Sequence, residues 1–244
     1  MAQRMLVSSG SLCALEVAST TLARRPRRYG FTEAQVEAGR QRAVVLVTGQ
    51  GHMRIAPLIA AMSRELAPGA ELQDRRHAGL DIVCMVLGGV LRHEPAGGAA
   101  TTLRAESVAV LSTGAGVDYR WRSIGEEPAH VVMLWMLGRP DGAPRIDVGI
   151  ASRVKRLGGL VAIAGRGTGL AVRGDVRVMA GVLPVGGSLV HVARGPRSYV
   201  MSTIGAITAN GIEAAACEGV VTERSGAIRI SARESTEVVV VETR

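Results

Sequence analysis

Short apolar runs recur along most of this chain, and turns rich in Gly, Pro, Asn or charged residues separate them. Runs of this length, spaced by roughly 8–12 residues, are typical of strands in an antiparallel barrel or sandwich, and they argue against alternating helices and strands. A helix is favoured only at residues 32–42, where Thr32 can serve as an N-cap. The predicted strands cover residues 43–47, 82–87, 107–111, 130–137, 160–164, 176–183, 199–204 and 238–241.

An internal repeat divides the chain into two similar units. The sequence Leu-Ala-Pro-Gly at 66–69 is followed by an apolar strand and by Gly89; Leu-Pro-Val-Gly at 183–186 is followed in the same way by Gly205, which lies 116 residues after Gly89. Repeated β-rich segments of this length indicate two related domains. We expect them at residues 45–140 and 145–244, joined by a turn-rich stretch at 138–144, with residues 1–44 as an N-terminal segment that packs on the first domain.

Composition restricts where the protein works and what it binds. Hydrophobic residues make up 47% of the chain but aromatic residues only 2%, so Val, Ile, Leu, Ala and Met must form the core. Three widely spaced cysteines suit a reducing cytoplasm, and the chain has no run of about 18 apolar residues that could cross a membrane. The net charge is +8, and the arginines at 24, 25, 27 and 28 form either a solvated loop or a polyanion contact. Because there are few aromatic side chains to stack on bases, we do not expect nucleic acid binding.

The spacing of potential catalytic and metal-binding residues gives no positive signal. The chain has five histidines, and no two are closer than 16 residues, whereas metal sites commonly take two ligands from one strand or helix. The glycines at 49 and 51 follow an apolar run but lack the third glycine of a dinucleotide-binding turn. No Gly-x-Ser-x-Gly motif is present. The residues alone therefore predict neither a cofactor nor covalent catalysis.

Several motifs occur in order along residues 66–121: Ala67-Pro68-Gly69, Arg75 to Asp81, Val86 to His93, Leu103 to Val108, and Leu111 to Trp121. This segment resembles the first cupin of the pirin family, and Gly195 to Tyr199 together with Ile204-Gly205 resembles the second; the likeness extends from about residue 45 to 244. The resemblance implies an all-β bicupin fold, with two antiparallel β-barrels of the jelly-roll type and few short helices. It also implies a relationship to metal-dependent dioxygenases that act on flavonol-like substrates, and to metal-free members described as redox-sensitive.

The sequence departs from the family pattern at the metal site. Metal-binding pirins carry His-Pro-His where this chain has Arg75-Arg76-His77, and His-x-Glu where it has Tyr119-Arg120-Trp121. Only His77 remains of the four ligands, and Arg75 brings a positive charge to the position of a cation. We therefore expect no metal ion in the first barrel, and no other cofactor.

The resemblance places Arg75, His77, Tyr119 and Trp121 at the mouth of the first barrel, where two interpretations remain open. The aromatic residues fill the volume of the missing ligands, or the four residues form a metal-free pocket for a small planar or anionic ligand. The expected function is a metal-free small-molecule-binding or regulatory protein, with a protein partner as a further option. The alternatives are a metal-independent isomerase or cyclase that uses His77 or Tyr119 as acid or base, and a quercetin 2,3-dioxygenase-like oxygenase.

Overall fold

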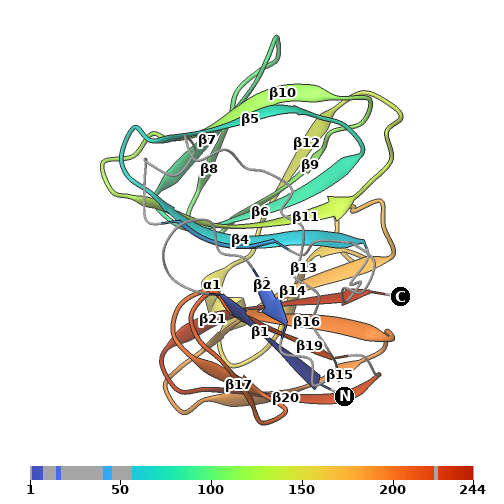
Figure 1. Cartoon of the computed structure of the whole chain (residues 1–244). Coiled ribbons are helices and arrows are strands. Elements are labelled where there is room, and N and C mark those ends of the chain that lie inside the picture. Colours follow the sequence, from blue (N-terminus) through green and yellow to red (C-terminus); the bar gives the residue numbers. More distant parts are fainter. Residues whose placement is uncertain (1, 8–14, 18–40, 46–56, 223–224, 244) are drawn as a thin grey trace.

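The computed structural model describes residues 2–7, 15–17, 41–45, 57–222 and 225–243. For residues 2–7, 15–17, 41–45 and 73–75 only the backbone is described. The arginines at 24–28, the glycines at 49 and 51 and the first nine residues of the expected helix at 32–42 lie outside the described residues; the last two residues of that helix begin a strand instead. The described chain forms two stacked β-barrels (Figure 1), which confirms the all-β bicupin fold.

The first barrel consists of a six-stranded and a four-stranded sheet, and every pair of neighbouring strands is antiparallel. The six-stranded sheet has the order β12 (Arg145–Ile150), β9 (Ser107–Ser112), β6 (Leu80–Gly88), β11 (Ala129–Leu137), β4 (Leu58–Leu66), β3 (Gln41–Val45). The four-stranded sheet has the order β5 (Glu71–His77), β10 (Val117–Ser123), β7 (Val90–Pro95), β8 (Thr101–Arg104).

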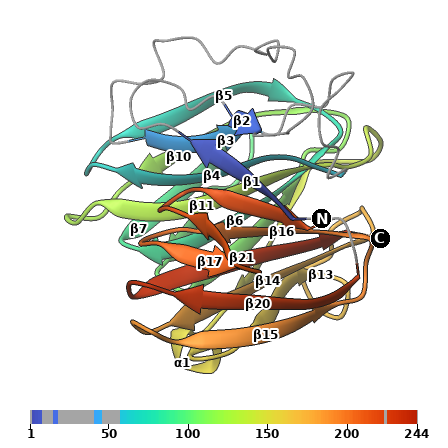
Figure 2. The same ribbon diagram turned by 60° about the horizontal axis from the view of Figure 1, so that its bottom comes forward.

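The second barrel repeats this plan with a seven-stranded and a four-stranded sheet. Figure 2 tilts the molecule so that this barrel comes forward. The seven-stranded sheet has the order β13 (Val161–Gly165), β14 (Val176–Leu183), β21 (Thr236–Thr243), β16 (Arg197–Ser202), β19 (Gly219–Thr222), β1 (Ala2–Val7), β2 (Leu15–Val17). The four-stranded sheet has the order β15 (Ser188–Ala193), β20 (Gly226–Ala232), β17 (Ile207–Ala209), β18 (Ile212–Ala214). The described part of the chain contains a single short helix, α1 (Arg153–Arg156), and no helix there is long and apolar enough to cross a membrane.

Three strands lie in the opposite barrel from the one that the sequence suggested. We expected residues 145–244 to form the second domain, but β12 pairs with β9 at the edge of the first barrel's larger sheet. We also expected residues 1–44 to pack on the first barrel, but β1 pairs with β19 of the second barrel and β2 pairs with β1, while β3 does join the first. The turn-rich stretch at 138–144 is therefore a connection within the first barrel. These placements depend on backbone pairing at open sheet edges, which the hydrophobic periodicity of the sequence does not reveal.

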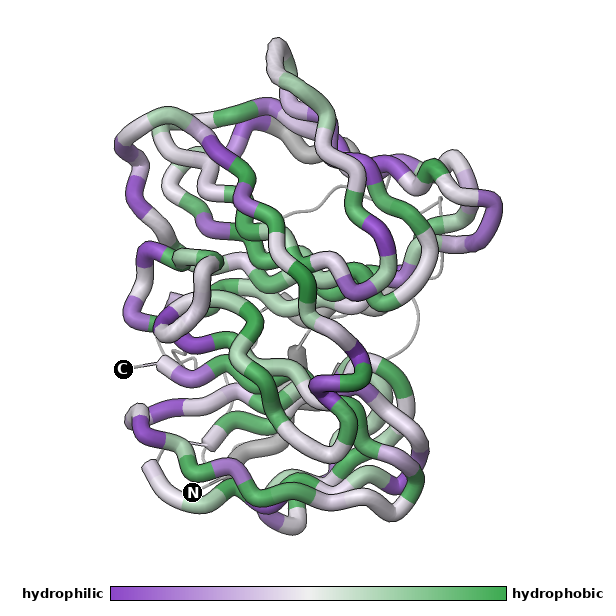
Figure 3. Tube along the Cα trace, turned by 180° about the vertical axis from the view of Figure 1, so that it is seen from behind, coloured by the Kyte–Doolittle hydropathy of each residue, from purple (hydrophilic) through white to green (hydrophobic). Residues whose placement is uncertain are grey.

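Three apolar clusters form the core, one inside each barrel and one between them. Along β21, Val238 and Val240 point into the second barrel, whereas Val239 and Val241 point toward the first. The central strands of both larger sheets are thus buried on both faces, which explains why these strands are continuous apolar runs. Figure 3 shows hydrophobic segments concentrated where the two barrels meet.

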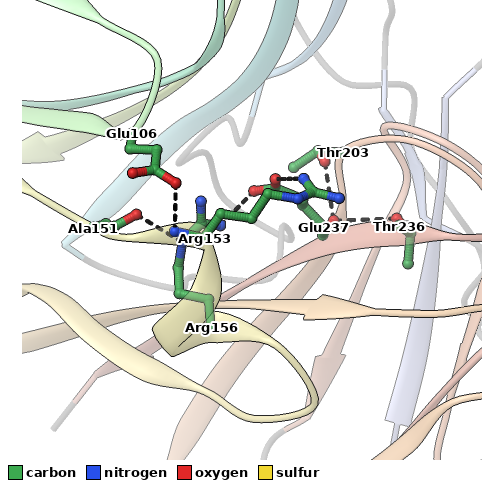
Figure 4. A network of polar contacts seen from close by, with 7 residues as sticks. All are labelled: Glu106, Ala151, Arg153, Arg156, Thr203, Thr236 and Glu237. Atoms are coloured by element: carbon green, nitrogen blue, oxygen red, sulfur yellow. Dashed lines mark hydrogen bonds and ion pairs between the residues drawn. The ribbon is translucent and has the colours of Figure 1, made fainter.

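A polar network around α1 connects the barrels beside this apolar contact (Figure 4). Glu106, in the turn between β8 and β9, accepts a hydrogen bond of 2.7 Å from the backbone N–H of Arg153. The Glu237 carboxylate of β21 accepts a hydrogen bond of 2.7 Å from Arg153 Nη1 and another from Arg156 Nη1. The Arg156 side chain is 2% exposed and also donates from Nε to the carbonyl of Ala151, at 3.0 Å. A short helix is therefore fixed between the two domains by the buried Arg156–Glu237 pair and by the partly exposed Arg153–Glu237 pair.

Candidate functional site

Strand β10 alternates strictly between buried and exposed residues, because one face of its sheet lines the first barrel and the other meets solvent. Tyr119 and Trp121 belong to the buried set, with 4% and 0% of their surface exposed. Their rings meet edge to face with centroids 6.2 Å apart. Two of the four expected site residues therefore occupy the barrel interior as adjacent aromatic side chains.

His77, at the end of β5, is brought to the same place from the neighbouring strand. Its Nδ1 lies 3.1 Å from the Tyr119 hydroxyl oxygen, a hydrogen-bond distance. Its ring meets Trp135 of β11 edge to face, with centroids 4.9 Å apart. The pairing of β5 with β10 is irregular between Val117 and Tyr119. His77 is only partly buried, so the His77–Tyr119 pair lies at the boundary between the barrel interior and solvent.

The remaining sequence-predicted residue, Arg75, has a side chain outside the described residues. Its neighbour Arg76 is exposed, pairs with Asp118 at 3.7 Å and donates to the carbonyl of Ala115. Asp118 thus points away from the barrel interior, as the alternation of β10 requires.

His93 on β7 completes the cluster, although the sequence analysis did not place it there. It lies directly opposite Trp121 in the antiparallel pairing, and the two ring centroids are 4.6 Å apart. Its ring is also 5.6 Å from that of Tyr119. The available signal was alternation: Leu91 and His93 share the buried face of β7, but a single histidine in a strand does not show which face is buried.

The environment of His93 is closed and lacks hydrogen-bond partners. The residue is 1% exposed, and burial lowers its pKa from 6.5 to about 4, so its imidazole is neutral at neutral pH. Within the described residues neither His93 ring nitrogen has a hydrogen-bond partner, and neither does Nε1 of the fully buried Trp121. Three polar nitrogens therefore meet inside the barrel without an acceptor or donor from the surrounding side chains.

The donor set does not fit the metal ion of metal-binding pirins. In the described part of the chain, no group of three or more His, Cys, Asp and Glu side chains is placed to hold a metal ion. His77 and His93 each lie close to the Tyr119 ring, and the indole N–H of Trp121 is a donor that cannot ligate a cation. Two imidazoles without a carboxylate provide too few ligands to retain Fe²⁺ or Ni²⁺.

The cysteines do not add a reactive group to this site. Cys84 of β6 is fully buried, and burial raises the pKa of its thiol, which disfavours the nucleophilic thiolate. Cys217 is buried as well, and its thiol lies 3.4 Å from the carbonyl oxygen of Thr203. Cys13 lies outside the described residues. Thiol chemistry therefore has no support from the two cysteines that are described.

Comparisons with known proteins agree with this architecture. A family model described as Pirin matches residues 49–136, and one described as the quercetinase C-terminal cupin domain matches residues 160–243. A Pseudomonas aeruginosa protein named as a candidate quercetin 2,3-dioxygenase is 26% identical over 184 residues, or 73% of this chain and 79% of that protein. A pirin-like protein of Caulobacter vibrioides is 25% identical over the same shares. The crystal structure of the Escherichia coli pirin YhhW in complex with nickel(II) has a TM-score of 0.69 at 18% identity, covering 86% of this chain and 96% of that one.

Proposed function

This chain belongs to the pirin family of bicupins, and from that premise we propose that it is a small-molecule-binding protein whose first barrel works without a metal ion. The ligand is a small planar or anionic molecule held among His77, His93, Tyr119 and Trp121. Arg75, which the resemblance places at the barrel mouth, remains part of the proposal as the anion contact because of its guanidinium group. The protein is expected to act in the cytoplasm, where cysteines stay reduced.

The observation that carries the proposal is the set of unpartnered ring nitrogens of His93 and Trp121. A buried N–H group without a hydrogen-bond acceptor costs free energy, so such groups usually mark an unseen partner. The Trp121 N–H requires an acceptor, and neutral His93 offers one donor and one acceptor. A carbonyl or carboxylate oxygen would satisfy the donors, whereas a cation would not. The aromatic walls favour a flat molecule.

A second candidate function is metal-independent acid–base catalysis. The hydrogen-bonded His77–Tyr119 pair supports it, because a partly exposed imidazole next to a phenol can move a proton to or from a molecule at the barrel mouth. The dioxygenase named for a relative receives less support, because it would need ligands that this chain replaces by Tyr119 and Trp121.

The experiment compares ligand retention with stability. Protein purified under mild conditions is analysed by native mass spectrometry, and a panel of aromatic and small organic acids is tested by calorimetry. Trp121→Phe removes the indole N–H but keeps a ring, so it should weaken retention by about tenfold at a modest loss of stability. Trp121→Ala should destabilise the fold by about 3–5 kcal/mol through the cavity that it leaves. If wild type retains nothing and binds no member of the panel, the aromatic cluster is only packing and the proposal fails.

Metal content gives an independent test. Purified protein should contain far less than one equivalent of Fe, Ni, Cu, Mn or Zn, and a chelator should leave its thermal stability unchanged. Near-stoichiometric metal that disappears in His77→Ala would overturn the metal-free part of the proposal.

A further inference from the structure

The interior of the second barrel changes from apolar to polar at one end. Most inward-facing side chains belong to a cluster of Val, Ile, Leu, Met and Ala residues. At the end where β21 finishes, the inward positions are instead polar, and this end lies near the marked C-terminus in Figure 1. We call this set the polar row; its members are Arg177, His191, Ser198, Thr222 and Glu242.

Strand pairing aligns four members of the polar row across adjacent strands. Arg177 of β14 lies directly opposite Glu242 of β21, Glu242 lies opposite Ser198 of β16, and Ser198 lies opposite Thr222 of β19. Directly opposite residues in antiparallel strands project from the same face. That face is the barrel interior, because the residues two positions farther along the four strands belong to the internal apolar cluster: Met179, Val240, Val200 and Val220.

His191 reaches the polar row from the opposite sheet. It lies on β15 between Leu189 and Ala193, which both contact the same apolar cluster, so its side chain is also directed inward. Its Nε2 is 3.5 Å from Glu242 Oε2, which is longer than a normal hydrogen bond. Burial lowers the pKa of His191, Glu242 opposes that shift, and Arg177 adds to it, so the imidazole is neutral at neutral pH.

The polar row has hydrogen-bonding capacity that the protein does not use. Within the described residues, Arg177 Nε, His191 Nε2, Ser198 Oγ and Thr222 Oγ1 are all buried and have no hydrogen-bond partner. Ser198 is 0% exposed and Thr222 is 5% exposed, so bulk water does not supply those partners. Buried polar atoms are rarely left unpaired in folded proteins, and four together indicate an unseen molecule.

The lack of hydrogen-bond partners is local, as the opposite end of the same barrel shows. There, Ser202 Oγ lies 2.8 Å from Thr236 Oγ1 and 2.7 Å from the carbonyl oxygen of Gly205. The hydroxyls at that end are therefore satisfied within the protein. Within the described residues, the unpartnered polar atoms that face the interior of this barrel lie at the end that holds the polar row, whereas the unpartnered Tyr199 hydroxyl belongs to the cluster between the barrels.

Glu242 is held in place by the backbone. Its Oε1 accepts hydrogen bonds from the backbone N–H groups of Arg194 and Gly195, the latter at 2.7 Å. The carboxylate is 6% exposed, so it is a fixed, buried acceptor directed at His191. The row thus combines a cationic donor, an anionic acceptor and two hydroxyls that can act as either.

We propose that the polar row is a binding site for a small hydroxylated carboxylate, such as a sugar acid. The carboxylate of the ligand pairs with the Arg177 guanidinium, which favours that geometry. Its hydroxyl groups donate to Glu242 and exchange hydrogen bonds with Ser198 and Thr222. A simple anion would donate no hydrogen bond to Glu242 Oε2, and a neutral polyol would bring no negative charge to Arg177. The site uses no residue of the first barrel, so its test is independent of the function proposed above.

The test titrates the full chain with gluconate by calorimetry and compares two matched probes. Glucose has the hydroxyls without the carboxylate, and acetate has the carboxylate without the hydroxyls. Gluconate should bind at least about tenfold more tightly than either probe, because only gluconate engages both parts of the row. Equal binding of glucose or of acetate would refute the proposed ligand class.

Variants then assign the site. Arg177→Gln and Ser198→Ala should each weaken gluconate binding by about tenfold, whereas Arg229→Gln removes the same charge from the exposed face of β20 and should leave binding unchanged. Thermal melting confirms that each variant is folded. The proposal is overturned if gluconate does not bind at concentrations up to about 10 mM, if Ser198→Ala folds and binds normally, or if a crystal soaked with gluconate shows only ordered water among the row.

Discussion

At the scale of single residues, the replacement of metal ligands by aromatic side chains changes what the nearby histidine can do. The His93 ring lies close to the rings of Tyr119 and Trp121, and within the described part of the chain neither of its nitrogens has a hydrogen-bond partner. Protonation would place an unpaired positive charge in an apolar interior. This is why burial depresses the pKa of His93 to about 4.

That shift predicts how stability depends on pH. The unfolded chain binds a proton at His93 near pH 6.5, whereas the folded protein resists protonation down to about pH 4. The contribution of neutral His93 to the free energy of unfolding is therefore fully present above the unfolded pKa. It is lost as the pH falls toward about 4, by roughly 3 kcal/mol in total. Urea unfolding at pH 7 and at pH 4.5 measures this loss, and His93→Phe, which cannot titrate, should show a smaller one. Equal losses in the two proteins would show that His93 is not held neutral.

The site also shows which residues the sequence can reveal. Alternation along β10 correctly indicated that Tyr119 and Trp121 share a face, and the site that the family resemblance suggested in the first barrel stays a prediction. His93 was missed because its role depends on pairing between β7 and β10, which brings residues 28 positions apart into contact. The polar row was missed for the same reason, since its four aligned members come from four strands.

At the scale of elements, burial on one or both faces determines which strands can be recognised. Seven of the apolar runs fall on strands, including β6, β14 and β21 of the larger sheets, which are covered on both sides; the run at 43–47 begins in β3 and continues outside the described residues. Strands of the smaller sheets meet solvent on one face, and in β10 the exposed positions are charged residues that alternate with buried ones. Runs are conspicuous in a sequence, whereas short alternating segments resemble loops.

Helix α1 has four residues and is too short to be stable by itself, so its contacts must hold it. The central contact is Glu237, which is 4% exposed and receives hydrogen bonds from Arg153 and Arg156. Because Arg156 is buried and the Arg153 side chain is 53% exposed, the two arginines should contribute very differently to stability.

Removing one partner of the buried pair should be costly. Arg156→Met leaves the Glu237 carboxylate with a single partner, and we expect a loss of about 3–5 kcal/mol in the free energy of unfolding. Arg153→Met is the matched control, with an expected loss of at most about 1 kcal/mol because its side chain is exposed. Chemical denaturation of both variants measures the difference. The double variant Arg156→Met, Glu237→Leu should recover part of the loss, and similar losses for the two single variants would contradict a dominant role for the buried pair.

At the scale of the whole molecule, the two barrels share one apolar core. The outer faces of their larger sheets pack against each other through residues such as Leu134 of β11 and Met201 of β16, which belong to a single buried cluster. Strand β12, which the sequence repeat would assign to the second domain, completes the first barrel, and β1 completes the second. The repeat revealed two units but not this exchange of strands, because edge pairing leaves no periodic signal.

This shared core predicts that the two barrels unfold together. Both tryptophans of the chain, Trp121 and Trp135, lie in the first barrel, so their fluorescence reports only that barrel, whereas far-UV circular dichroism reports both. Met201→Ala, in the second barrel's contact face, should cost about 2–5 kcal/mol. Because a cooperative unit unfolds in a single transition, the fluorescence and dichroism midpoints should shift together in denaturant.

Ile230→Ala supplies the matched control, because Ile230 lies inside the second barrel and does not belong to the shared cluster. If the barrels form one cooperative unit, this variant should also lower the midpoint of tryptophan fluorescence, although the substituted side chain belongs to the other barrel's own core. Independent barrels would behave differently: fluorescence would keep its wild-type midpoint while dichroism developed two transitions. If Ile230→Ala alone shows these separate transitions, the shared apolar cluster positions the barrels without coupling their folding. If both variants show separate transitions, the single-unit prediction is wrong.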